Sequence, residues 1–370
     1  MYSKYFLCKL SEKERYILKK NPHCIMFFCE LDRIKEINDN KKNDITGFKY
    51  NRHFKKKNYL ENSNLKKKDI IQFFKQKKIY KYIDDIIKLN LSKKVLKYQP
   101  TGQRPKTTLH YGQLKLLLST LQFLTYYGKK RKVNIIYPGS APGYNIEVLT
   151  NFFPNCYWYL YDPIPFNKKL YSNKNVIEIE NTLFTENIIK KLKKKINNEY
   201  TLFISDIRID NDEKNIDRDN KLQMDWVSKI RPNYAQLKFR VPRNVKNYRY
   251  LDGKIYLQMY SPMTSTETRL VVNGKNLKYK KYNLDNYEGL LYYFNRVLRP
   301  SYYKSNYNLE CFDHCHDCVA TINLINDYKK KYNTDISKKN MKEIINLILN
   351  KLKNSKYKIC THYKNLLKNL

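Results

Sequence analysis

The chain has 370 residues, of which 42% are hydrophobic, so it can bury one large core or two smaller ones. Its 73 lysines and arginines outnumber 34 acidic residues, and the formal net charge of +39 favours a polyanionic partner. No apolar run approaches the roughly 18 residues of a membrane span, and the eight cysteines lack the spacing of a secreted disulfide scaffold.

Three segments follow one another along the chain. Residues 1–100 form a Lys-rich extension with one predicted helix at 69–91, where apolar residues recur at helical spacing. We expect this extension to add RNA affinity through phosphates, although an A/T-rich genome also produces many lysines without selection for binding. The extension begins with charged residues where a signal peptide would be apolar. We therefore expect a cytoplasmic protein with no membrane partner.

Residues 101–300 alternate short β-rich runs with helical patterns, which predicts an α/β domain with a mostly parallel central sheet. An apolar helix is expected at 111–126, before the first strand. Residues 301–370 are predicted to be a helical, basic segment with a helix at 341–352. The strands are expected at 133–137, 157–161, 201–205, 235–240 and 254–259.

A small-residue turn follows the first predicted strand. Gly139 and Gly143 would let the backbone approach a ligand at the carboxyl end of that strand. The next strand ends in Asp162, about 20 residues on, where an acid suits ribose hydroxyls. The turn lacks both G-x-G-x-x-G and a Walker lysine, so the pattern indicates a nucleoside cofactor without phosphates, or only a tight turn.

Several motifs together resemble one family, the poxvirus-type cap-specific mRNA 2′-O-methyltransferases, which double as the small subunit of poly(A) polymerase. The resemblance covers roughly residues 108–300, and it implies a Rossmann-like S-adenosylmethionine-dependent methyltransferase fold. The matching segments are 111–118 (YGQLKLLL), 137–143 (YPGSAPG), 203–208 (FISDIR), 237–240 (LKFR), 265–270 (STETRL), 286–288 (NYE) and 292–295 (YYFN).

The resemblance implies a catalytic tetrad of Lys115, Asp206, Lys238 and Glu267. A ribose hydroxyl attacks a methyl group poorly until it loses its proton, and a lysine accepts that proton only if it is neutral. Lys115 and partial burial would favour the neutral form of Lys238, while the two acids would orient the lysines.

The resemblance also implies S-adenosyl-L-methionine as cofactor and capped mRNA as substrate, with a poly(A) polymerase catalytic subunit as a possible partner. Arg208 and Arg240 would lie near RNA phosphates, and Glu288 matches an acid of the cap pocket. Two other cap-pocket positions of the family, an aromatic residue and an aspartate, align with Arg243 and Val245. The implied cofactor-binding residues are Gln113, Tyr137, Gly139, Gly143, Asp162 and Asp206, with a backbone contact near Leu183.

A cluster of thiols and imidazoles lies at Cys311, His314, Cys315, His316 and Cys318. Cysteine with histidine invites a zinc site, but the spacing lacks a paired C-x-x-C knuckle. We therefore predict no metal, and a partly buried helix or a polar surface segment instead.

Two other functions stay open beside the methyltransferase. One is a non-catalytic RNA-binding processivity subunit of a viral poly(A) polymerase, which is compatible with enzyme activity in the same chain. The other is a methyltransferase that acts on rRNA or tRNA with the same tetrad.

Overall fold

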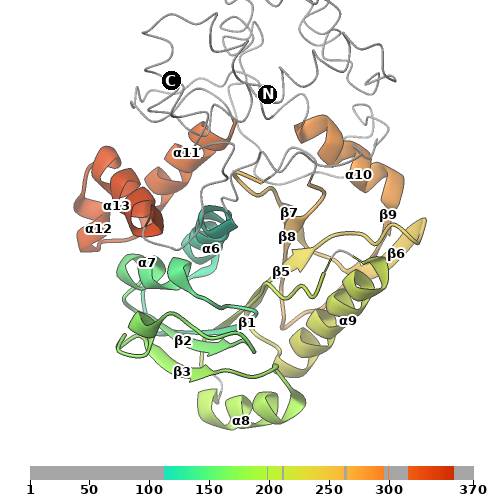
Figure 1. Ribbon diagram of the computed structural model, residues 1–370, viewed down its shortest axis with the longest axis horizontal. Helices are drawn as coiled ribbons and strands as arrows, with labels where there is room; N and C mark the ends of the chain where they lie inside the picture. The colour runs from blue at the N-terminus through green and yellow to red at the C-terminus, as the bar shows by residue number, and fades with distance from the viewer. Residues whose placement is uncertain are drawn as a thin grey trace, which may run out of the picture.

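The computed structural model describes residues 112–197, 199–210, 212–261, 265–295, 299 and 316–353 (Figure 1). The helix predicted at 69–91 lies outside these residues. The domain boundaries predicted near residues 100 and 300 stay predictions.

Within the described residues, one sheet holds seven strands in the order β3-β2-β1-β4-β5-β8-β7. The first five strands in this order run parallel, while β8 is antiparallel to both β5 and β7. The predicted α/β class with a mostly parallel sheet is therefore confirmed. The strands are β1 (Val133–Pro138), β2 (Cys156–Tyr161), β3 (Val176–Glu180), β4 (Thr201–Ser205), β5 (Tyr234–Phe239), β7 (Lys254–Tyr256) and β8 (Thr268–Val272).

The central strands are apolar on both sides because helices cover both faces of the sheet. Side chains alternate along a strand, so Ile135 of β1 packs into one core and Ile136 into the other. In β5, Leu237 and Phe239 point into the second core. Lys238 therefore projects to the opposite face, toward the first core.

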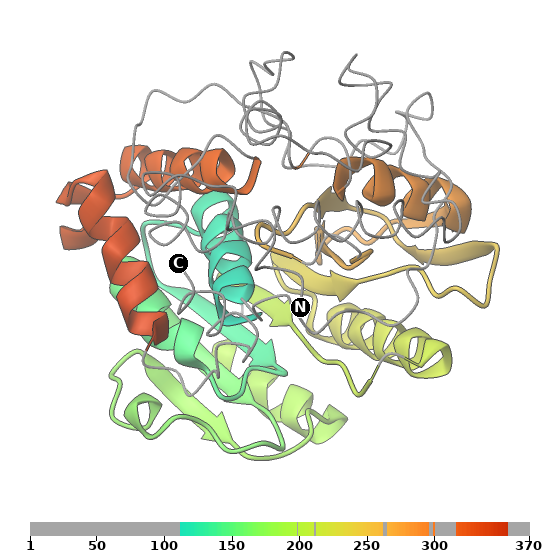
Figure 2. The same cartoon turned by 45° about the horizontal axis from the view of Figure 1, so that its top comes forward.

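Two layers of helices cover the sheet, as Figure 2 shows. On one face lie α6 (Gly112–Tyr127) and α7 (Tyr144–Phe152), and on the other lie α8 (Glu186–Ile196) and α9 (Glu213–Ile230). The helices α11 (His316–Lys331), α12 (Asp335–Lys338) and α13 (Met341–Lys353) pack outside α6 and α7. No described helix is both long and apolar enough to cross a bilayer.

The strand order places a topological switch point at the edge where β1 and β4 end, and a crevice is expected there. From β1 the chain continues outward to β2 and β3, whereas β4 starts the other half of the sheet. Ligands of such sheets bind beside the carboxyl ends of strands at this switch point. The loop at 138–143 and the residues after Ser205 therefore border the position where a ligand is expected.

The sequence prediction missed some of the strands and placed others well. The five predicted strands exist, with ends that differ by at most three residues, and the strand at 201–205 matches β4 at both ends. It missed β3, β8 and a separate two-stranded sheet of β6 (Asn247–Leu251) and β9 (Tyr279–Asn283), after which α10 (Leu284–Tyr293) begins. These two paired strands and β3 carry many charged or polar residues, so an apolar run did not reveal them.

Candidate active site

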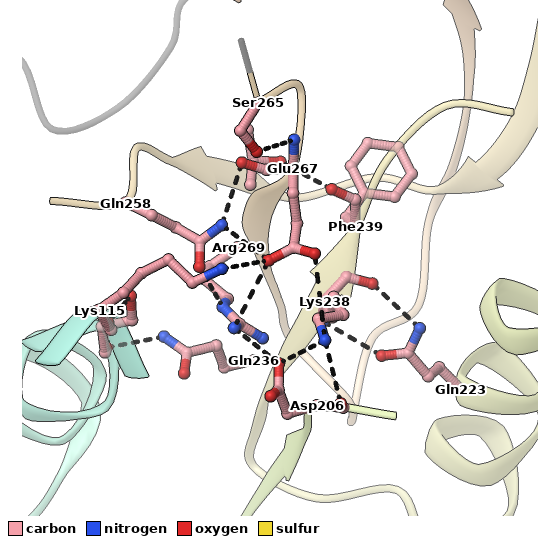
Figure 3. Close-up of polar contacts among 12 residues, drawn as sticks. Lys115, Asp206, Gln223, Gln236, Lys238, Phe239, Gln258, Ser265, Glu267 and Arg269 are labelled. Atoms are coloured by element: carbon pink, nitrogen blue, oxygen red, sulfur yellow. Dashed lines mark hydrogen bonds and ion pairs between the residues drawn. The ribbon is translucent and has the colours of Figure 1, made fainter. Parts of the chain in front are cut away.

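The four residues of the predicted tetrad lie together, although they come from four different parts of the fold (Figure 3). Lys115 lies in the first turns of α6, Asp206 follows β4, Lys238 is in β5 and Glu267 directly precedes β8. Lys115 Nζ lies 2.9 Å from Glu267 Oε1, and Lys238 Nζ lies 3.1 Å from Asp206 Oδ1. Lys238 Nζ is also 4.0 Å from Glu267 Oε2. The two acids thus connect the two lysines, and the catalytic roles of all four stay predictions.

A fifth charge, Arg269, completes this cluster and was missed in the sequence. Its side chain is only 2% exposed, and it lies directly opposite Lys238 in the antiparallel pairing of β5 with β8. Two like charges in opposite positions repel each other. Asp206 Oδ1 offsets this repulsion, because it lies 2.7 Å from Arg269 and 3.1 Å from Lys238. Three cations and two carboxylates leave this charge cluster with one positive charge in excess.

The alternation of side chains along a strand could have revealed Arg269. Residues two apart in a strand point to the same side of the sheet. Arg269 stands two residues after Glu267 in the segment 265–270. The signal was a charged residue within a strand that is otherwise apolar and continues with Leu270 and Val271.

The cations of the cluster set the ionisation of both acids. Burial alone would raise the pKa of the Asp206 carboxyl, but the charges of Arg269 and Lys238 hold that pKa below its ordinary value. Burial also opposes ionisation of Glu267, and Lys115 with Lys238 holds its pKa well below the ordinary value. Both carboxyl groups are therefore ionised at neutral pH.

We expect Glu267→Gln to destabilise the protein most at neutral pH, with a difference from wild type that narrows in acid. A carboxyl whose pKa is depressed on folding contributes stability above its unfolded value of about 4.3, and that contribution is lost as the pH falls through the folded pKa. Urea unfolding at pH 7, 5 and 3.5 measures the difference. Asp335→Asn is the control, because the Asp335 side chain is 98% exposed. A constant difference for Glu267→Gln at every pH would contradict the prediction.

The turn at 139–143 is fitted closely to the end of β4. Gly139 has φ 76°, and a Cβ there would lie 2.7 Å from the Ile207 amide nitrogen. The Asp206 amide donates to the Pro138 carbonyl over 3.2 Å. Gly143, with φ 75°, is the N-cap of α7. Side chains larger than glycine would therefore displace the backbone that borders the crevice.

Asp162 lies beside this turn, at the end of β2. Its carboxylate accepts the Ala141 amide over 3.0 Å and the Ile164 amide over 2.9 Å. Each oxygen accepts one amide and keeps a free lone pair. Ser140 Oγ is buried and has no hydrogen-bond partner within the described part of the chain. These polar atoms fit the hydroxyl groups of a nucleoside.

The other predicted cofactor residues border the same crevice to different extents. The Tyr137 ring is buried in β1, and burial raises the pKa of its hydroxyl. Gln113 belongs to the first turn of α6, while Leu183 follows β3 and is 68% exposed. Contact of these three residues with a cofactor stays a prediction.

The residues predicted to bind RNA or the cap are ion-paired with neighbouring side chains. Arg208 lies 3.6 Å from Asp219, and Arg240 lies 2.6 Å from Glu213. Glu288 is buried and lies 2.7 Å from Arg243 Nε. Their contacts with RNA stay predictions.

Glu288 also supports the segment that carries Glu267. It accepts the Thr266 hydroxyl over 3.3 Å, next to the tetrad acid. Arg243 is the cation that pairs with Glu288. An acid that is paired with arginine attracts a cationic base less than a free acid does.

Only two residues of the Cys/His cluster belong to the described chain. His316 Nδ1 lies 3.2 Å from Asp317, and the Cys318 thiol is buried in α11. Cys311, His314 and Cys315 lie outside the described residues. Among the residues that the structure describes, no group of three or more His, Cys, Asp or Glu side chains is placed to hold a metal ion.

Known proteins resemble this chain in sequence. The family model described as "Poly A polymerase regulatory subunit" matches residues 75–354. A cap-specific mRNA (nucleoside-2′-O-)-methyltransferase of Myxoma virus (strain Lausanne) is 32% identical over 227 residues, 55% of this chain and 67% of the relative. The protein of the same description from Fowlpox virus (strain NVSL) is 30% identical over 210 residues, 51% and 68% of the two chains.

A comparison with solved structures finds a capping enzyme. Bluetongue virus VP4, described as a multifunctional RNA-capping production line, matches 63% of this chain with a TM-score of 0.40 and 16% identity. This chain spans 40% of the VP4 chain.

Proposed function

Because the chain belongs to the Poly A polymerase regulatory subunit family, we propose that it is a cap-specific mRNA 2′-O-methyltransferase. It transfers a methyl group to the ribose 2′-hydroxyl of a cap-proximal nucleotide of viral mRNA in the cytoplasm. The relatives named for this activity support the reaction class. The observation that carries the proposal is the charge cluster at the crevice, with Lys238 between Asp206 and Glu267.

In the proposed reaction Lys238 is the general base. The ribose oxygen would form a bond to the methyl carbon while the bond from that carbon to the donor's sulfonium sulfur breaks, so that the sulfur leaves as a neutral thioether and the hydroxyl proton passes to Lys238 Nζ. Lys238 must release a proton before substrate binds, and this release leaves the charge cluster neutral. Arg269 stays protonated throughout, because a guanidinium does not lose its proton in proteins. Asp206 and Glu267 then hold Lys238 and Lys115 toward the crevice.

S-adenosyl-L-methionine is the proposed methyl donor, since its sulfonium supplies an activated methyl group. Asp162 would accept hydrogen bonds from the ribose of the cofactor through its free lone pairs. The turn at 139–143 would approach the cofactor with its backbone, and Asp206 would border its methyl end. The unpartnered Ser140 hydroxyl is a further donor in this turn.

A methyl-transfer assay tests the proposed function. The wild-type chain is incubated with radiolabelled S-adenosylmethionine and one short RNA, which is supplied either capped or uncapped. We expect label only in the capped RNA, and nuclease digestion should locate it on a 2′-O-methyl group beside the cap. Equal labelling of uncapped RNA, rRNA or tRNA would reject cap specificity, and no labelling of any RNA would reject the enzyme.

Asp162→Ala is expected to weaken S-adenosylmethionine binding by about tenfold or more, because a hydrogen bond to a charged group is worth roughly 1.5–3 kcal/mol. Calorimetry measures the affinity, and a thermal melt reports whether the turn at 139–143 still folds. The control is Asp225→Ala, which removes an exposed acid on α9. Unchanged affinity of a folded Asp162→Ala variant would locate the cofactor elsewhere.

The description of the family favours a second function, regulation of a poly(A) polymerase. In that function the chain binds RNA for a polymerase catalytic subunit and needs no methyl transfer. Tail synthesis by such a subunit, with and without this chain, tests the second function. If Lys238→Ala stimulates the polymerase as well as the wild type does, the two activities are separate.

A further inference from the structure

Gln258, two residues after the end of β7, connects two members of the charge cluster (Figure 3). The side-chain amide of this buried residue donates to Glu267 Oε1 over 3.2 Å and to the Glu267 carbonyl over 3.0 Å. Its oxygen accepts the Arg269 Nε proton over 2.9 Å. One neutral side chain therefore fixes both an acid and a cation without changing the net charge of the cluster.

The backbone at Gln258 is itself held by a buried arginine. Arg299 is 1% exposed and donates from one guanidinium nitrogen to the Gln258 carbonyl over 2.9 Å and to Ser261 Oγ over 2.8 Å. Its other terminal nitrogen donates to the Ser261 carbonyl. This planar fork fixes two carbonyl groups at once, which a lysine ammonium cannot reproduce with the same geometry.

Helix α11 holds Arg299 from the other side. Asp317 Oδ1 lies 3.5 Å from Arg299 Nε, and the His316 amide donates to the Arg299 carbonyl over 3.1 Å. The Phe294 ring lies 5.0 Å from the guanidinium carbon. The segment after β7 is therefore fixed by the first turn of a helix that packs outside the sheet and its covering layer.

These contacts matter because Glu267 has competing cations. Lys115, Lys238 and Arg269 all lie within 4.0 Å of its carboxylate. Rotation of the carboxylate toward any one of them would weaken its attraction to the others. The amide of Gln258 removes this freedom, since it occupies Glu267 Oε1 and leaves Oε2 directed toward Lys238.

We propose that Gln258 is a positioning residue of the methyl-transfer site, and that Arg299 and α11 set its place. The inference rests on the proposed function, because it concerns how Glu267 and Arg269 act on Lys238. It assigns a role in the reaction to the C-terminal helices, which contain none of the tetrad residues. Substrate and cofactor need not touch Gln258.

Two substitutions at Gln258 test the positioning role in the full chain. Gln258→Met keeps the volume and removes the hydrogen bonds, and we expect kcat to fall by about tenfold or more with little change in KM for capped RNA. Gln258→Glu adds a negative charge beside Glu267 and Arg269, in the same charge cluster as Lys238. This charge favours protonated Lys238. The acidic limb of the plot of kcat against pH should therefore shift to higher pH, by roughly one pH unit or more.

The matched control is Gln236→Met, at another buried glutamine, which lies in β5. The Gln236 amide donates to the Ser119 carbonyl, and within the described residues no hydrogen bond joins its side chain to the charged groups of the cluster. We expect this variant to lose thermal stability and to keep the acidic limb of the wild-type plot of kcat against pH.

Arg299→Lys tests whether Arg299 sets the place of Gln258. If this variant folds, it should lower kcat as Gln258→Met does.

Titration of the Lys238 ammonium by NMR, with labelled lysine and Lys238→Arg for assignment, separates the two possible failures. If the wild type transfers no methyl group, the proposed function fails, and the positioning role still predicts a higher titration midpoint in Gln258→Glu. If the wild type is active and both Gln258 variants keep its kcat and its acidic limb, the positioning role is wrong. A loss of stability equal to that of Gln236→Met, with the limb unmoved in Gln258→Glu, would assign Gln258 to folding alone.

Discussion

Lys238→Ala is expected to lower kcat for methyl transfer by about 100- to 10,000-fold, the usual cost of removing a general base. Cofactor affinity should change little, because Lys238 lies on β5 while the turn at 139–143 and Asp162 follow other strands. Single-turnover methyl transfer to a short capped RNA measures the rate, and calorimetry measures the cofactor affinity.

Lys238→Arg is the informative companion of this variant. A guanidinium keeps the positive charge between Asp206 and Glu267, but it cannot accept a proton at neutral pH. We expect it to be about as inactive as Lys238→Ala. Lys191→Ala removes an exposed lysine on α8 and should keep wild-type activity. Substantial turnover by Lys238→Arg would mean that the site needs only a cation at this position.

Arg269→Met should lower the free energy of unfolding by roughly 3–5 kcal/mol, the usual cost of removing one partner from a buried ion pair. The methionine fills a similar volume and leaves Asp206 without its closest cation, which lies 2.7 Å away. The pKa of Asp206 should then rise, because the charge of Arg269 is the strongest influence that lowers it. Urea unfolding at pH 7 measures the stability.

The control for Arg269→Met is a substitution of a cation whose ion-pair partners are exposed. Lys229 pairs with Asp225 and Glu186 at the surface of α9, so Lys229→Met should leave the unfolding free energy almost unchanged. If Arg269→Met were as stable as the wild type, the charge cluster would not depend on its buried guanidinium. The rate of methyl transfer by Arg269→Met, measured at a temperature where the variant is folded, then reports how the loss of Arg269 affects the action of Lys238 apart from stability.

The local sequence was sufficient for the parts of the fold that depend on short-range patterns. The apolar residues before Gly139, the small residues that follow and the acid at Asp162 predicted a strand, a tight turn and a second strand that ends in an acid, and the structure has these elements in that order. The predicted helix at 341–352 matches α13. The sequence prediction missed the strands β6 and β9 because their stability comes from pairing with each other, and the sequence of either segment alone does not show this pairing.

The family resemblance implied the four tetrad residues, but it gave no distances among them and missed Arg269 and Gln258. Lys115 and Glu267 are 152 positions apart, and only the tertiary fold, which places α6 beside the start of β8, brings them to 2.9 Å. The register of β5 against β8 places Lys238 opposite Arg269, so a shift of one residue would remove that pair from the cluster.

The sequence by itself determined the α/β class, the tight turn at 139–143 and the basic character, because these follow from composition and from periods of a few residues. Tertiary structure alone decided the charge balance of the site, in which three cations meet two acids. It also decided the support of Glu267 through Gln258 and Arg299. The physical reason is that Coulomb forces and hydrogen bonds act over a few ångströms in space, and chain folding sets those distances between residues far apart in sequence.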